Sequence, residues 1–167
     1  MARHPHRLQR RRYIGAYTHF LTACVYDRQE AFRDHELALE TTEQLLLTCR
    51  KHGFAVFAHT LMPDHVHVLF QGLRQDSDFL KCLNRWRQLS GYWHRQKTGR
   101  YLWQEGYWDF TLRDDDSLLS IGSYIVNNPV VAGLAASPTE YPFSGSERFS
   151  IAELGSYQPV KPRAGDI

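Results

Sequence analysis

Two histidines one residue apart, in the stretch HTLMPDHVHVLF (59–70), are the residues best suited to chemistry in this sequence. The apolar and β-branched residues around them are typical of a buried strand. Alternation along a strand sends residues i and i+2 to the same face, so His65 and His67 project together while Val66 and Val68 point the opposite way. Two neighbouring imidazoles can hold a metal ion through neutral ring nitrogens. Partly buried histidines bonded only to backbone groups would fit the same pattern.

A tyrosine in the segment DDDSLLSIGSYIVNNP (114–129) is the second candidate. The segment opens with acids suited to a helix N-terminus and closes at a proline, which predicts a helix. On a wheel of about 100° per residue, Asn128 lies roughly 40° from Tyr124, whereas Leu118 and Ile125 lie roughly 100–120° away in the apolar stripe. A core tyrosine normally lies inside such a stripe. We therefore expect Tyr124 and Asn128 to face polar surroundings, as an ordinary surface tyrosine would also do.

Basic residues are unevenly distributed, although the net charge of the 167-residue chain is only +2. The first twelve residues, MARHPHRLQRRR, contain five arginines and no acid. Residues 79–104 contain six further Lys and Arg and again no acid, whereas acids gather in RDDDS (113–117). This asymmetry predicts a polyanionic partner more strongly than the net charge does.

The cysteine pattern favours a reducing compartment. Cys24, Cys49 and Cys82 are far apart, odd in number and outside any C-x-x-C spacing, so neither a disulfide framework nor a cysteine zinc site is expected. The sequence contains no apolar run long enough to span a bilayer. The arginine-rich start lacks the apolar stretch of a secretory signal. These features predict a cytoplasmic protein without membrane contact.

The order of predicted elements indicates one α+β domain. It is a mainly antiparallel sheet with helices packed on one face. Gly53 is placed to end the first helix, a turn at 62–64 joins two strands, and Ser77 is a candidate cap for the second helix. The predicted elements are a strand in 17–27, a helix in 34–53, two strands in 54–72, a helix after 77, one or two strands in 98–113 and a helix in 114–129. Around this domain, taken as residues 13–150, we expect a flexible basic arm (1–12) and a loose C-terminal tail (151–167).

Two of these stretches resemble a known family. MPDHVHVLF is similar to the HUH motif (histidine, hydrophobe, histidine) of the single-tyrosine, IS200-like transposases. The stretch 102–146, with its YIxxNPxxAGL pattern, resembles the carboxyl half of the REP-associated tyrosine transposases, where REP stands for repetitive extragenic palindrome. The likeness runs from about Tyr13 to Ser146. It is specific because both motifs occur in the family's order.

The resemblance implies a ferredoxin-like or RRM-like sheet with the HUH motif on a central strand. It also implies that His65 and His67 bind a divalent metal, Mg²⁺ or Mn²⁺, with Asn128 as the third ligand. Tyr124 would be the nucleophile, forming a 5′-phosphotyrosine with single-stranded DNA and releasing a 3′-hydroxyl, without a nucleotide cofactor. The family commonly has Asn where Asp64 stands. A turn role for Asp64 is favoured over a role as extra ligand or partner of the histidines.

The implied substrate is a REP hairpin with a single-stranded flank, bound in the nucleoid by a monomer or homodimer. Trp86 and Trp93 could stack bases, but core packing is the favoured role at helical spacing. The basic arm could equally be a solubilising tail. A hairpin-binding module without catalysis and a hydrolytic nuclease using metal-bound water are the alternative functions. The residues expected to contact DNA phosphates are Arg3, Arg7, Arg10, Arg11, Arg12, Lys81, Arg85, Arg87 and Arg95.

Overall fold

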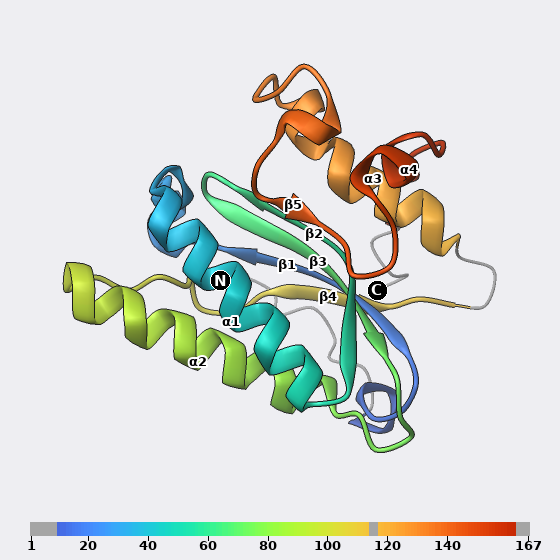
Figure 1. The fold of residues 1–167 in the computed structure, drawn as a ribbon. Helices are drawn as coiled ribbons and strands as arrows, with labels where there is room; N and C mark the ends of the chain where they lie inside the picture. The colour runs from blue at the N-terminus through green and yellow to red at the C-terminus, as the bar shows by residue number, and fades with distance from the viewer. Residues whose placement is uncertain (1–9, 114–116, 163–167) are drawn as a thin grey trace, which may run out of the picture.

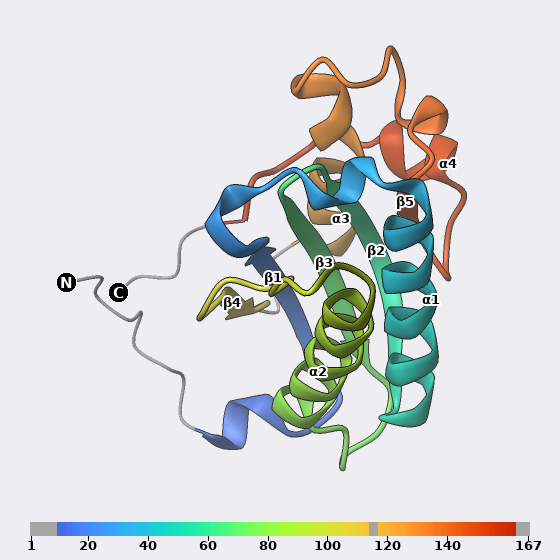
Figure 2. The same ribbon diagram turned by 90° about the vertical axis from the view of Figure 1, so that its left-hand side faces the viewer.

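One antiparallel sheet organises the computed structural model, which describes residues 10–113 and 117–162. Within these residues the strand order is β4-β1-β3-β2-β5, and every neighbouring pair is antiparallel (Figure 2). The strands are β1 (Thr18–Cys24), β2 (Phe54–Met62), β3 (His65–Gly72), β4 (Trp108–Thr111) and β5 (Ser144–Gly145). The turn between β2 and β3 falls where the sequence predicts it.

Four α-helices and four short 3₁₀ segments complete the described chain. The order β1-α1-β2-β3-α2-β4 is the ferredoxin-like βαββαβ arrangement, with β5 added beside β2. The predicted α+β class with a mainly antiparallel sheet is confirmed. The helices are α1 (His35–Lys51), α2 (Phe79–Thr98), α3 (Leu118–Val131) and α4 (Ile151–Gly155), and the 3₁₀ segments are η1 (Arg10–Tyr13), η2 (Tyr26–Arg28), η3 (Ala31–Arg33) and η4 (Pro138–Glu140).

Helices cover both faces of the sheet, which corrects the prediction that they pack on one. Helices α1 and α2 lie on one face, and α3 and α4 lie on the other (Figure 1). Alternation in β1 shows the cause, because Leu21 belongs to the first apolar cluster and Phe20 to the second, on the α3 side. All nine residues of β2 are buried. Strands that are apolar on both sides need cover on both sides.

The helix ends agree with the predictions in part. Gly53 follows α1 with φ of 77°, a left-handed conformation that glycine adopts without strain. The cap of α2 is Asp78 rather than the predicted Ser77, because the Asp78 carboxylate accepts from Lys81 N while the Ser77 hydroxyl donates to Gly53 O. Helix α3 continues to Val131, past the proline at which it was predicted to close.

The two ends of the chain differ in how far they are described. Residues 1–9 of the predicted basic arm lie outside the described residues. The predicted loose tail (151–167) needs correction, because α4 begins at residue 151 and buries Leu154 completely against α3. Val160 N then donates to Ser120 O at 3.1 Å, which holds the following segment along α3. No helix in residues 10–113 and 117–162 combines the length and apolar character needed to cross a membrane.

Candidate active site

The two histidines lie side by side on β3, the middle strand of the sheet. Their ring centroids are 4.8 Å apart with an interplanar angle of 80°. His67 is buried and His65 is partly exposed. The two histidines therefore lie on the same face of β3, as predicted, with His65 near solvent and His67 in the interior.

Side chains, not backbone groups, hold the two imidazoles. His67 Nδ1 is hydrogen-bonded to Thr22 Oγ1 at 2.9 Å, across the β1–β3 pairing in which these residues are partners. His65 Nδ1 is hydrogen-bonded to Asp64 Oδ1 at 2.6 Å. Over the described residues, Nε2 of neither histidine forms a hydrogen bond. When Thr22 and Asp64 accept hydrogen bonds from the Nδ1–H groups, each Nε2 carries no proton and its lone pair can bind a metal ion.

The environment of His67 keeps its imidazole neutral. The pKa of His67 is lowered to about 3, mainly by burial and to a smaller extent by the nearby charges of His65 and Lys161. The neutral imidazole is the form that binds metals. Lys161 belongs to the segment that follows α4, so the C-terminal part of the chain brings positive charge close to His67.

Tyr124 reaches the same place from α3. Its ring centroid lies 6.0 Å from that of His67 and 6.5 Å from that of Phe20 on β1. Ile121 and Ile125, on the buried side of the helix, anchor α3 in the second apolar cluster, and Tyr124 is only partly buried at the edge of this cluster. The sequence prediction that Tyr124 lies outside the apolar stripe agrees with this position. Residues 57 positions apart thus meet at one point of the sheet.

Asn128 follows Tyr124 by one helical turn and is also partly buried. Its Nδ2 donates to the backbone oxygen of Tyr124 at 2.8 Å. This bond directs the amide so that Oδ1 is left without a hydrogen bond from the described residues. An amide oxygen without a hydrogen bond can bind a metal ion.

The side chains present fit a divalent cation. The described residues contain no group of three or more His, Cys, Asp or Glu placed to hold a metal. A cation here would therefore take His65 and His67 together with an oxygen donor of another type, such as the Asn128 amide, a water molecule or a phosphate of the substrate. Two fixed imidazoles with mixed oxygen donors suit Mn²⁺ better than Mg²⁺, which prefers oxygen ligands.

The predicted phosphate-contacting residues are scattered over the molecule. Arg3 and Arg7 lie outside the described residues, as does the side chain of Arg10, whereas Arg11 and Arg12 are exposed in η1. Lys81 and Arg85 line a groove between α1 and α2, on the other side of the sheet from α3.

The last two predicted phosphate contacts, Arg87 and Arg95 of α2, lie over aromatic rings. Arg87 donates to Gln104 O at 2.6 Å and lies over the rings of Trp103 and Tyr107, so it is engaged within the fold. Arg95 is exposed and lies over the Tyr101 ring. Trp86 is completely buried, as its favoured core role predicts.

Three neighbours of the histidines escaped the sequence analysis or were ranked low in it. Thr22 was not considered, because its role depends on the register between β1 and β3. Lys161 was assigned to a loose tail. Asp64 was favoured as a turn residue, and the structure adds a contact with His65 and an ion pair with Arg28 at 3.3 Å.

Known proteins are similar to this chain over the part that contains the candidate site. Residues 13–128 match the family model described as "Transposase IS200 like", which spans both histidines, the tyrosine and Asn128. A REP-associated tyrosine transposase from Escherichia coli is 24% identical over 139 residues, covering 83% of this chain and 82% of the relative. A Haemophilus influenzae protein assigned to the same group is 26% identical over 158 residues, covering 87% of this chain and 88% of the relative.

Solved structures share the fold. The structure of a REP-associated tyrosine transposase bound to a REP hairpin superposes with a TM-score of 0.67 and 20% sequence identity, covering 86% of this chain and 82% of that one. A Deinococcus radiodurans protein described as a transposase superposes with a TM-score of 0.50 and 17% identity, covering 68% of this chain and 88% of that one. At these identities the likeness concerns the fold alone.

Proposed function

Because the chain belongs to the IS200-like transposase family, we propose that it cuts and rejoins single-stranded DNA through a covalent bond between Tyr124 and a 5′-phosphate. One observation carries this proposal. The ring centroid of Tyr124 lies 6.0 Å from that of His67, which lies 4.8 Å from that of His65, so the proposed nucleophile is beside the two imidazoles proposed to bind the metal. A nucleophile must lie this close to the groups that bind its target phosphate.

Tyr124 supplies the attacking oxygen. Its Oη forms a bond to the phosphorus of a DNA phosphodiester while the bond from phosphorus to the 3′-oxygen breaks. The phenol proton passes to water and the released 3′-oxygen takes up a proton, so the strand ends as a 5′-phosphotyrosine and a free 3′-hydroxyl. Attack by a 3′-hydroxyl on the phosphotyrosine reverses these bond changes. The covalent bond conserves the phosphodiester, so rejoining requires no ATP.

The chain's own residues prepare this reaction. A protonated phenol is a weak nucleophile, so Tyr124 needs a polarised target. His65 and His67 would hold Mg²⁺ or Mn²⁺ through Nε2, with Asn128 Oδ1 as the third ligand. When bound, the cation polarises a phosphoryl oxygen and offsets negative charge in the transition state. Thr22 and Asp64 orient the imidazoles, and α3 positions the phenol.

A DNA hairpin is the kind of substrate that the relatives support, and the proposed cut lies in a single-stranded flank of that hairpin. Two relatives belong to the REP-associated group, and a protein of the same fold is described as bound to a REP hairpin. Positive charge for the DNA backbone is available near the site from Lys161, and Arg11 and Arg12 are exposed elsewhere, in η1.

Covalent capture tests the proposal. The full chain is mixed with Mn²⁺ and a REP hairpin that carries a single-stranded flank and a label at the 3′ end of the strand, which stays with the 5′-phosphotyrosine fragment, and the products are resolved on a denaturing gel. The wild-type protein is expected to give a labelled, denaturant-resistant adduct that chelation abolishes. Tyr124→Phe should give none, whereas Tyr157→Phe, which alters another partly exposed tyrosine near α3, should react like wild type.

Other outcomes would contradict the proposal. An adduct formed by Tyr124→Phe would assign the nucleophile to another residue. Hairpin binding that survives both chelation and Tyr124→Phe, with no adduct from any protein, would indicate a binding module without catalysis. Cleavage by Tyr124→Phe that leaves protein-free ends would indicate hydrolysis by metal-bound water.

A further inference from the structure

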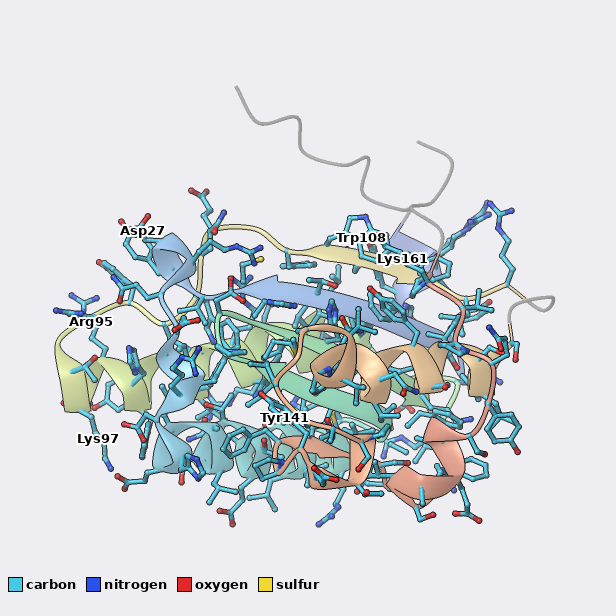
Figure 3. The ribbon with its side chains drawn as sticks, turned by 90° about the horizontal axis from the view of Figure 1, so that it is seen from above. Asp27, Arg95, Lys97, Trp108, Tyr141 and Lys161 are labelled. Atoms are coloured by element: carbon cyan, nitrogen blue, oxygen red, sulfur yellow. The ribbon has the colours of Figure 1, made fainter. Side chains whose placement is uncertain are left out.

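Two exposed tyrosines and an arginine lie together at the end of the sheet where β1 stops and β3 begins. Tyr26 in η2 and Tyr101 after α2 are 50% and 60% exposed, and their ring centroids are 5.9 Å apart. The Arg95 guanidinium carbon lies 4.7 Å from the centroid of the Tyr101 ring. Figure 3 shows Arg95 and Asp27, the neighbour of Tyr26, at the same end of the molecule. We call Tyr26, Tyr101 and Arg95 the aromatic platform.

The backbone holds this platform in place. Tyr26 N donates to Leu102 O at 2.8 Å, and Gln104 N donates to Cys24 O at 3.0 Å. These bonds flank an antiparallel bridge between Val25 and Trp103, which joins the two segments. Val25 and Leu102, each beside a platform tyrosine, are 1% exposed in the core. With Val25 and Leu102 held in the core, the adjacent side chains of Tyr26 and Tyr101 lie at the surface.

The platform is connected to the candidate active site by a short series of contacts. Val25 N donates to Asp64 O at 2.8 Å, and the Arg28 guanidinium pairs with the Asp64 carboxylate at 3.3 Å. The same carboxylate is bonded to His65 Nδ1 at 2.6 Å. Asp27 and Arg28 both have left-handed backbone, with φ of 54° and 53°, and this sharp reversal directs Arg28 back toward Asp64. The segment that carries Tyr26 is thus bonded to Asp64, whose carboxylate also holds His65.

From these contacts we infer that the aromatic platform binds the bases of single-stranded DNA beside the cleavage site. Exposed aromatic rings offer stacking faces to bases of any sequence, and an arginine beside them offers charge to the phosphates. Duplex DNA hides its base faces within the stack, so the platform selects unpaired nucleotides. The inference deepens the proposed function and rests on it for the position of the cut, but base binding can be measured without cleavage.

The first test measures binding of fluorescein-labelled dT12 to the full chain by fluorescence anisotropy, with EDTA present so that no cleavage occurs. Tyr26→Leu and Tyr101→Leu are each expected to weaken binding by about fivefold or more, the lower end of what one base–aromatic stack contributes. Tyr101→Phe retains the ring and should bind like wild type. Tyr92→Leu is the matched control, because Tyr92 is 67% exposed on α2 and has no ring contact with the described residues.

Affinity for duplex DNA of the same length distinguishes base stacking on the platform from contacts with the phosphate charge. The two leucine variants are expected to bind this duplex like wild type. Wild-type affinity for dT12 in both variants, or an equal loss for dT12 and duplex, would overturn the inference. Far-UV circular dichroism and thermal melting of each variant check the fold, and crosslinking of a 5-iodouracil flank to Tyr26 or Tyr101 in the wild-type protein is expected independently.

The covalent capture assay tells the two proposals apart. A Tyr124-dependent adduct together with unaltered dT12 binding by the leucine variants would refute the platform and leave strand transfer intact. Loss of dT12 binding by these variants, with no adduct from the wild-type protein, would support the platform and contradict strand transfer.

Discussion

Replacing Thr22 by valine removes the group that holds His67 while nearly preserving the shape of the side chain. Thr22 Oγ1 lies 2.9 Å from His67 Nδ1, and no other hydrogen bond to this imidazole occurs over the described residues. Metal binding through Nε2 requires the ring proton on Nδ1, where the threonine oxygen accepts it. Without that acceptor, the proton can move to Nε2 and block the metal, and the ring loses its fixed orientation.

The expected loss of metal affinity follows from this geometry. Partners of metal-binding histidines typically change metal affinity by about 10- to 100-fold, which corresponds to about 1.4–2.7 kcal/mol. The metal-free protein also loses one buried hydrogen bond, which lowers its free energy of unfolding by about 1–3 kcal/mol. Because burial already lowers the pKa of His67 to about 3, the ring stays neutral in the variant and protonation does not explain the change.

Isothermal titration calorimetry with Mn²⁺ measures the effect at neutral pH. Thr22→Val is expected to bind Mn²⁺ 10- to 100-fold more weakly than wild type, and Thr22→Ser, which keeps the hydroxyl, should restore most of the affinity. Thr18→Val changes a threonine of the same strand that pairs with Gln71 instead, so it should bind like wild type. Unchanged Mn²⁺ affinity in Thr22→Val would refute the reasoning that this hydroxyl selects the ligating form of His67.

Three further predictions concern other parts of the molecule. Asp64→Ala removes the acceptor bonded to the imidazole of His65, so Mn²⁺ affinity measured by calorimetry should fall by about 10- to 100-fold, and an unchanged affinity would limit Asp64 to its turn. Burial lowers the pKa of His19 to about 3 and of His59 to about 4, so below pH 6.5 the unfolded chain binds more protons than the folded one. The free energy of unfolding therefore falls as the pH decreases from 6.5, and urea titrations should show a loss of about 2 kcal/mol per histidine at pH 5 relative to pH 8. A free energy of unfolding that does not change with pH would contradict this. Leu154→Ala should lower the free energy of unfolding by about 2–5 kcal/mol, whereas Leu39→Ala, at an exposed position, should have little effect; equal stability of the two variants would contradict the packing of α4 on α3.

Local pattern was sufficient to predict the main elements and the two halves of the candidate site. Alternation placed His65 and His67 on one face, and the helical wheel placed Tyr124 outside the apolar stripe. Each prediction depends on residues a few positions apart, where backbone geometry fixes direction. The resemblance to a family, and not the pattern, joined the two halves before the structure placed their rings 6.0 Å apart.

Features that depend on long-range pairing could not be predicted in this way. Thr22 contacts a histidine 45 residues away, through a strand register that only tertiary packing sets. The second apolar face of the sheet was missed because a strand buried on both sides has no clear alternation. The helix around Leu154 was missed for a related reason, since the single leucine that anchors it is a weak signal next to polar and turn-forming residues.

Anomalous diffraction from a crystal soaked with Mn²⁺ tests the central claim most directly. The account predicts one strong peak bonded to Nε2 of His65 and of His67, on the side of the sheet that faces Tyr124, with the Asn128 amide oxygen completing the protein ligands. A soaked crystal without a peak at these histidines, or with a peak bonded to them on the side away from the tyrosine hydroxyl, would contradict it.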